Sequence, residues 1–160
     1  MQRWIGGLVI SRIYPLLARL FGVEPGSLWL KEAVVIKYVP ADADETGGAE
    51  GEGVPAGVAE HRDASVFSFN ILLNDPAEFG GGGTLFPGLG LRDLQEQAGA
   101  SEGEGGDQAA GGERGGVVRL ARGGAVLHAG KAEHAGLPVT RGSRFMLAGF
   151  VQLCGRCHPE

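Results

Sequence analysis

Hydrophobic residues near the N-terminus recur at intervals of three and four, which is the spacing of one face of an α-helix. The pattern extends over Trp4–Phe21, and two glycines and Pro15 weaken it. It therefore predicts two short helical pieces, of which the second covers Tyr14–Phe21 and ends before Gly22. We interpret this region as helix packed against a sheet; a helix lying on a membrane surface is the alternative.

Beyond Pro25 the pattern changes to short runs of β-branched, aromatic and aliphatic residues, separated by turns rich in glycine and proline. The expected strands are 28–38, 66–73, 84–86, 117–120, 125–128 and 144–153. The strongest of them, Val66–Leu73, ends at the turn Asn74-Asp75-Pro76. Many short strands with little helix after residue 25 predict a mainly β fold, either a sandwich or a jelly roll.

Glycine is unusually frequent, at 30 of the 160 residues, against an average of about 7%. The chain has no Gly-x-y period, which excludes collagen, and its 43% hydrophobic content excludes disorder of the whole chain. Nineteen of the glycines fall in the segments 41–57 and 80–116, which also hold most of the acidic residues. The net charge of −5 therefore describes acidic inserts at 41–57 and 88–116, and it gives no reason to expect a nucleic-acid partner. We interpret the inserts as solvated loops; attraction of a basic peptide is the alternative.

Signals for targeting and for disulfides are weak in this sequence. No apolar run is long enough to cross a membrane, and the stretch Trp4–Ile10 leads to no small-residue cleavage site, so we expect neither a membrane span nor a signal peptide. Two cysteines are too few for a disulfide framework. The tail from Cys154 to His158 matches the haem-attachment pattern C-x-x-C-H, but two thiols, a small disulfide or an adventitious zinc site are plainer interpretations.

An His-x-Asp motif, His61 and Asp63, stands just before the strongest predicted strand. If the extended backbone of that strand reaches back to His61, its two-residue period places both side chains on one face. One further histidine would then complete a 2-His-1-carboxylate facial triad for a metal ion. The alternative is a surface turn with a capping aspartate.

Two longer blocks place this motif in a wider pattern. Residues 61–86 read HRDASVFSFNILLNDPAEFGGGGTLF, and residues 134–150 read HAGLPVTRGSRFMLAGF. In these blocks, and over about residues 27–152, the sequence resembles the iron(II)- and 2-oxoglutarate-dependent dioxygenases, in the branch of the prolyl 4-hydroxylases and procollagen-lysyl hydroxylases. The lysyl hydroxylase-like members look closer. The resemblance implies a double-stranded β-helix, a cupin-like jelly roll, with short N-terminal helices before it.

The same resemblance sets the expected domain organisation. Residues 1–26 form an N-terminal helical segment, 27–153 the dioxygenase domain with its two inserts, and 154–160 a tail. Members of the family usually carry more chain before the first matched strand, so we expect either a reduced domain or a piece of a longer protein. The run Gly80–Gly83 lacks the Lys-Ser/Thr of a phosphate-binding loop, and the family implies a tight turn there.

By the resemblance, His61, Asp63 and His134 align with the iron ligands, and Arg144 aligns with the base that binds the distal carboxylate of 2-oxoglutarate. A guanidinium suits this role because it can pair with a carboxylate through two hydrogen bonds. Arg141 is the competing base, but it lies in a predicted turn, whereas Arg144 begins an apolar strand.

Three further residues are candidates for the same site. Tyr38 and Asn70 match positions that touch the cosubstrate in this family; a core tyrosine and a strand asparagine bonded to backbone are the alternatives. His128 precedes His134 by six residues. We expect it to line the pocket or to pack near the iron rather than to replace His134 as a ligand.

The resemblance implies an enzyme that uses Fe(2+), with 2-oxoglutarate as cosubstrate and ascorbate as a reductant. It would hydroxylate a C–H bond, of a peptidyl lysine or proline, and release succinate and CO2. A protein or peptide substrate follows, in the endoplasmic reticulum or the cytoplasm. The alternatives are a non-catalytic jelly-roll module that binds a metal, and a small-molecule hydroxylase of the same chemistry.

Overall fold

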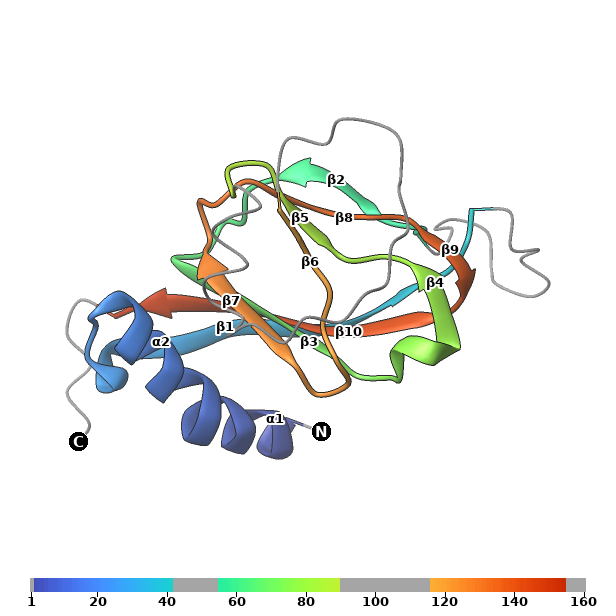
Figure 1. Cartoon of the computed structure of the whole chain (residues 1–160). Coiled ribbons are helices and arrows are strands. Elements are labelled where there is room, and N and C mark those ends of the chain that lie inside the picture. Colours follow the sequence, from blue (N-terminus) through green and yellow to red (C-terminus); the bar gives the residue numbers. More distant parts are fainter. Residues whose placement is uncertain (1, 42–54, 90–115, 155–160) are drawn as a thin grey trace, which may run out of the picture.

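The structure is a computed structural model that describes residues 2–41, 55–89 and 116–154. Most of the acidic inserts and of the tail lie outside these residues, so the predictions for those segments stay predictions. The described part is mainly β, with antiparallel sheets and a helical N-terminus, as the sequence predicts (Figure 1). None of its helices combines the length and the hydrophobicity that a membrane crossing requires.

The two predicted helical pieces are confirmed, the second with its expected bounds Tyr14–Phe21, and a π-helical segment joins them without a break. The N-terminal helical region consists of α1 (Gln2–Leu8), the π-helical segment η1 (Val9–Ile13) and α2 (Tyr14–Phe21). At the end of η1 the Tyr14 N–H donates to the Val9 carbonyl, one residue further back than in an α-helix. Pro15, which has no N–H, follows in the first turn of α2, where proline is tolerated. The predicted end is confirmed: Gly22 caps α2 with a left-handed φ of 65°.

The described strands form two four-stranded sheets that face each other, and a two-stranded ribbon beside them (Figure 1). The first sheet has the order β1 (Leu28–Tyr38), β10 (Arg144–Leu153), β3 (Phe67–Leu72), β7 (Ala125–Ala129). The second has the order β2 (Val58–His61), β8 (His134–Gly136), β5 (Thr84–Phe86), β6 (Gly116–Val118). The ribbon pairs β4 (Phe79–Gly81) with β9 (Val139–Gly142), and the 3-10 helices η2 (Pro25–Ser27) and η3 (Pro76–Glu78) lie in turns. Every strand pair is antiparallel.

All six predicted strands are confirmed, with shifts of up to two residues at their ends. The sequence missed four others, β2, β4, β8 and β9, each of only three or four residues. Three of these four contain glycine, and none has a hydrophobic alternation long enough to be recognised. Their existence therefore depends on pairing with distant strands.

The strand β10 is covered on both of its faces. Leu147 and Val151 belong to a buried cluster on the outer side of the first sheet. The N-terminal helical region supplies Val9, Ile13 and Leu17 to that cluster. The alternate residues Met146 and Ala148 face the other way and line a cavity between the sheets. The helical region thus covers the outer face of the first sheet, and the inner face of β10 borders the cavity.

Gly149 is a position in β10 where a side chain would collide with the core. A Cβ atom there would overlap the ring of Phe69, a fully buried residue of β3. We expect Gly149→Ala to lower the free energy of unfolding by about 3 kcal/mol, because overpacking forces neighbouring side chains off their preferred positions. Thermal melts measure this, with Gly26→Ala as the control, since a Cβ at Gly26 meets nothing within 4 Å. Equal melting temperatures of the two variants would contradict this packing.

Candidate metal centre

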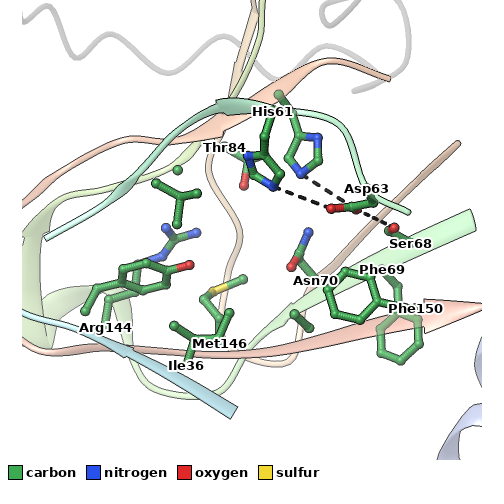
Figure 2. A pocket seen from close by; sticks show the side chains of 15 residues that line it. Ile36, His61, Asp63, Ser68, Phe69, Asn70, Thr84, Arg144, Met146 and Phe150 are labelled. Atoms are coloured by element: carbon green, nitrogen blue, oxygen red, sulfur yellow. Dashed lines mark hydrogen bonds and ion pairs between the residues drawn. The ribbon is translucent and has the colours of Figure 1, made fainter. Parts of the chain in front are cut away.

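His61, Asp63 and His134 form a compact cluster, and Figure 2 shows His61 and Asp63 side by side at the cavity between the two sheets. His61 ends β2, and its register partner in the β2–β8 ladder is His134, which begins β8. The Nε2 atoms of His61 and His134 lie 3.4 Å and 3.9 Å from the two carboxylate oxygens of Asp63. One ligand atom of each residue lies within 4.8 Å of the other two. The structure therefore brings the three predicted ligands together.

The route by which His61 and Asp63 converge differs from the expected one. The strand β3 begins only at Phe67, and His61 belongs to β2 in the opposite sheet. Asp63 lies in the segment that connects the two sheets, where its N–H donates to the Gly130 carbonyl at 2.8 Å. The condition that the extended backbone of β3 reaches back to His61 is not met, because the chain changes sheets between His61 and β3.

Hydrogen bonds to the backbone orient both imidazoles for metal binding. The Nδ1 of His61 lies 2.8 Å from the Ala59 carbonyl, and the Nδ1 of His134 lies 2.9 Å from the Ala132 carbonyl. A carbonyl oxygen can only accept, so each Nδ1 carries the proton and each Nε2 presents a lone pair. An ion about 2.1 Å from each ligand atom places those atoms roughly 3–4 Å apart. The separations within the cluster fit such an ion after small side-chain movements.

A chain of two serines holds the carboxylate of Asp63. The Ser68 hydroxyl donates to Asp63 Oδ2, and the Ser65 hydroxyl lies 2.8 Å from that of Ser68. Asp63, Ser65 and Ser68 are all buried. Such partners fix the direction of a ligand and its basicity.

We expect Ser68→Ala to weaken metal binding by roughly 10-fold to 100-fold, as losses of outer-shell partners do. The physical reason is that Asp63 loses the hydroxyl that fixes its rotamer. Titration with Co(II), followed by absorbance, measures the affinity. Ser27→Ala is the control, because its hydroxyl caps only the local carbonyl of Glu24; equal affinities of the two variants would show that the Ser68 contact is not needed.

The cluster borders a cavity of about 180 Å³ between the sheets. In Figure 2 His61 and Asp63 lie at one side of this cavity and Arg144 at the other, with Met146 between them on the floor. Arg144 is only 4% exposed although it carries a permanent charge. A buried cation that faces a cavity is a binding group for an anion, since an unpaired buried charge is unfavourable.

Arg144 has weak internal partners. Its Nη1 donates to the Gly83 carbonyl at 3.4 Å, and its guanidinium lies 5.7 Å from the centre of the Tyr38 ring. Burial lowers the pKa of Arg144, and burial raises the pKa of Tyr38 against a smaller opposite effect of the guanidinium. At neutral pH the pair therefore offers a cation and a phenolic O–H donor.

The glycine run before β5 packs directly against Arg144. Gly81, Gly82 and Gly83 have left-handed φ values of 70°, 69° and 116°, which other residues rarely adopt. A Cβ at Gly82 would lie 3.2 Å from Cδ of Arg144. The expected tight turn is wrong: Gly80 and Gly81 belong to β4, and the chain continues through Gly82 and Gly83 into β5 along the same antiparallel partner segment. The lack of side chains in this run leaves room for the arginine stem.

The remaining candidates are placed as follows. Tyr38 and Asn70 both line the cavity, and Tyr38 also belongs to a small buried cluster between the sheets. Arg141 is exposed, with its Nη2 3.3 Å from the Phe79 carbonyl. The expectation that Arg144 rather than Arg141 is the buried base is confirmed.

His128 packs beside the cluster and is not one of the residues that line the cavity. Its ring centre lies 4.5 Å from that of His134 and 5.3 Å from that of Phe86. Burial is the main cause that lowers the pKa of His128. The expectation that His128 packs near the candidate metal site is therefore confirmed, because its ring lies beside that of His134.

Sequence reasoning missed Ser68 and Thr84 as residues of the site. Ser68 supports Asp63, and Thr84, at the start of β5, lines the cavity. A signal for Ser68 was available, because in the run Phe-Ser-Phe-Asn-Ile the polar residues Ser68 and Asn70 share one face of the strand. Of the C-x-x-C-H tail only Cys154 lies within the described residues.

No protein-family model matches the chain, and no curated protein matches it.

Proposed function

We propose that the chain is an Fe(II)- and 2-oxoglutarate-dependent dioxygenase that hydroxylates a C–H bond of a peptidyl lysine or proline. The observation that carries this proposal is the placement of two histidines and an aspartate at one side of a small cavity and a buried arginine at the other. The first set suits a divalent metal ion. The arginine suits a carboxylate.

His61, Asp63 and His134 would hold the iron and leave part of its coordination sphere open. Bound there, Fe(II) supplies the activation of O2 that couples the conversion of 2-oxoglutarate to succinate and CO2 with the addition of one oxygen atom to the substrate C–H bond. The two backbone carbonyls that accept from the Nδ1 atoms keep both Nε2 lone pairs available. Zinc, copper and nickel also bind such donors, so the oxidation chemistry requires loading with iron.

Arg144 would bind the carboxylate of 2-oxoglutarate that is remote from the metal. Its partners inside the protein are a single long hydrogen bond and an aromatic face, which leaves guanidinium donors for a ligand. Tyr38, protonated at neutral pH, can donate a further hydrogen bond in the cavity. A cavity of about 180 Å³ suits a small dicarboxylate and leaves little room for a second molecule.

The sheet arrangement supports the proposed double-stranded β-helix, or jelly roll. Two antiparallel sheets of the orders β1-β10-β3-β7 and β2-β8-β5-β6 face each other, and the chain passes repeatedly from one to the other. The candidate site lies between the sheets, where a jelly roll encloses its ligands.

The substrate would approach from the side of His61. The His61 side chain is 39% exposed, whereas those of Asp63 and His134 are 8% and 7% exposed. A substrate too large for the cavity can therefore reach the metal only with a protruding group, such as a lysine or proline side chain of a peptide. Ascorbate would act as the reductant that keeps the iron in the Fe(II) state.

The test is succinate release by the protein loaded with Fe(II), with 2-oxoglutarate and ascorbate. We expect turnover that requires the iron and rises when lysine- or proline-containing peptides are added. Binding of metal and 2-oxoglutarate without turnover would instead identify a metal-binding module. Stimulation by free amino acids but not by peptides would identify a small-molecule hydroxylase.

A further inference from the structure

The imidazole of His134 lies close to two other imidazoles, those of His61 and His128. The ring centres of His61 and His134 are 4.3 Å apart, and those of His134 and His128 are 4.5 Å apart. His128 belongs to β7, where its register partner in β3 is Ser68, the residue that supports Asp63. The third imidazole therefore faces the same interior as the candidate ligands.

The Nε2 atom of His128 is buried and has no hydrogen-bond partner within the described residues. Its Nδ1 lies 3.0 Å from the Ala129 carbonyl and carries the proton, so Nε2 is an acceptor without a donor. A buried acceptor in this state destabilises the fold. A phenylalanine would fill the same place beside Phe86 and His134 without this loss of stability. The presence of a histidine there indicates that its Nε2 accepts a hydrogen bond in the functional protein.

The described side chains of the cluster have no spare hydrogen for this acceptor. His61 and His134 donate their Nδ1 protons to the Ala59 and Ala132 carbonyls. Ser68 donates to Asp63, and Ser65, which is hydrogen-bonded to Ser68, must then donate to it. Within the described part of the chain, a bound molecule is the remaining source of a donor. A water on a metal ion beside His134 would suit this place, because the ion makes such a water a stronger hydrogen-bond donor.

We propose that Nε2 of His128 accepts a hydrogen bond from a water molecule bound to the metal ion beside His134. His128 is then a positioning residue of the centre: it contacts the metal through this water and is not a ligand. The inference rests on the metal-binding part of the proposed function and not on its oxidation chemistry. It predicts that His128 raises metal affinity while it lowers the stability of the metal-free protein.

The variant His128→Phe tests this, because it keeps a ring against His134 and removes only the nitrogens. We expect a roughly ten-fold loss of Co(II) affinity, a changed visible spectrum of bound Co(II), and a melting temperature of the metal-free protein that is equal or higher. Phe86→Leu is the packing control, since Phe86 contacts both His128 and His134 through its ring. An unchanged Co(II) affinity and spectrum in His128→Phe would overturn the proposal, and so would an equal loss in Phe86→Leu.

A measurement on the unaltered protein keeps the test decisive if the variant does not fold. With ¹⁵N-labelled histidine, Zn(II) addition should shift the Nε2 resonance of His128 in the direction of an accepted hydrogen bond, by less than the Nε2 shifts of His61 and His134. No shift would overturn the proposal, and a shift as large as those of the two ligands would show direct coordination instead. Failure of the unaltered protein to bind any metal would reject both the proposed function and this inference. Zn(II) binding that leaves the Nε2 resonance of His128 unshifted would reject this inference alone.

Discussion

Replacing Asp63 with alanine is expected to abolish metal binding and, with it, all iron-dependent turnover of 2-oxoglutarate. Asp63 supplies the one negative charge among the three candidate ligands, and its two oxygens face the Nε2 atoms of His61 and His134. Loss of a mere outer-shell partner lowers metal affinity 10-fold to 100-fold. Removal of the carboxylate itself should therefore lower Co(II) affinity by more than about 100-fold, as titration followed by absorbance would measure.

Asp75→Ala is the matched control for this prediction. Asp75 is an exposed aspartate whose side chain only caps η3, by accepting from the Ala77 N–H at 2.9 Å. The Asp75→Ala variant should bind Co(II) with the affinity of the unaltered protein and release succinate at the same rate. Persisting tight Co(II) binding in Asp63→Ala would mean that the metal binds elsewhere, and the candidate centre would then be wrong.

Replacing Arg144 with methionine is expected to remove 2-oxoglutarate binding from the metal-loaded protein. Two charge-assisted hydrogen bonds to a carboxylate contribute about 3 kcal/mol or more, which is at least roughly 100-fold in affinity. Titration of the Mn(II)-loaded protein with 2-oxoglutarate measures this loss. The melting temperature of the ligand-free variant should not fall, because methionine removes a buried charge that has weak internal partners.

The chain offers a matched control for this arginine. Arg141 is exposed and three residues away, so Arg141→Met should leave 2-oxoglutarate affinity unchanged. Arg144→Lys should bind with intermediate affinity, because it keeps the charge and loses the planar fork. If Arg141→Met weakened binding and Arg144→Met did not, the roles of the two arginines would be exchanged.

The long elements of the fold could be predicted because their residues repeat with a regular period. In β10 the apolar residues cover both faces, and in β3 the residues Phe67, Phe69 and Ile71 alternate with Ser68 and Asn70. Such patterns follow from the burial of a strand in a sheet. The short strands β2 and β8 have no such pattern, although they position two of the candidate ligands.

The candidate site was predicted residue by residue, but its geometry was not. His61 and Asp63 were candidates from their motif, and the resemblance of the two sequence blocks to a dioxygenase family added His134 and Arg144. The convergence of His61 and Asp63 does not come from one shared strand, because the chain changes sheets after His61. The burial of Arg144 was expected because it begins an apolar strand. The support of Asp63 by Ser68 was not expected, although only five residues separate them, because Asp63 lies outside the strand that carries Ser68.

The sequence by itself determined which parts of the chain are strand and helix where the pattern is long, and which side chains have metal-binding chemistry. These properties are local: they follow from the period of apolar residues and from the donor atoms of each residue type. Only the tertiary structure decided that His61 faces His134 across a ladder between β2 and β8, and that His128 is left beside them with an unmatched nitrogen. The pairing of His61 with His134 joins residues more than 60 positions apart, and no local pattern encodes the register in which two such short strands meet.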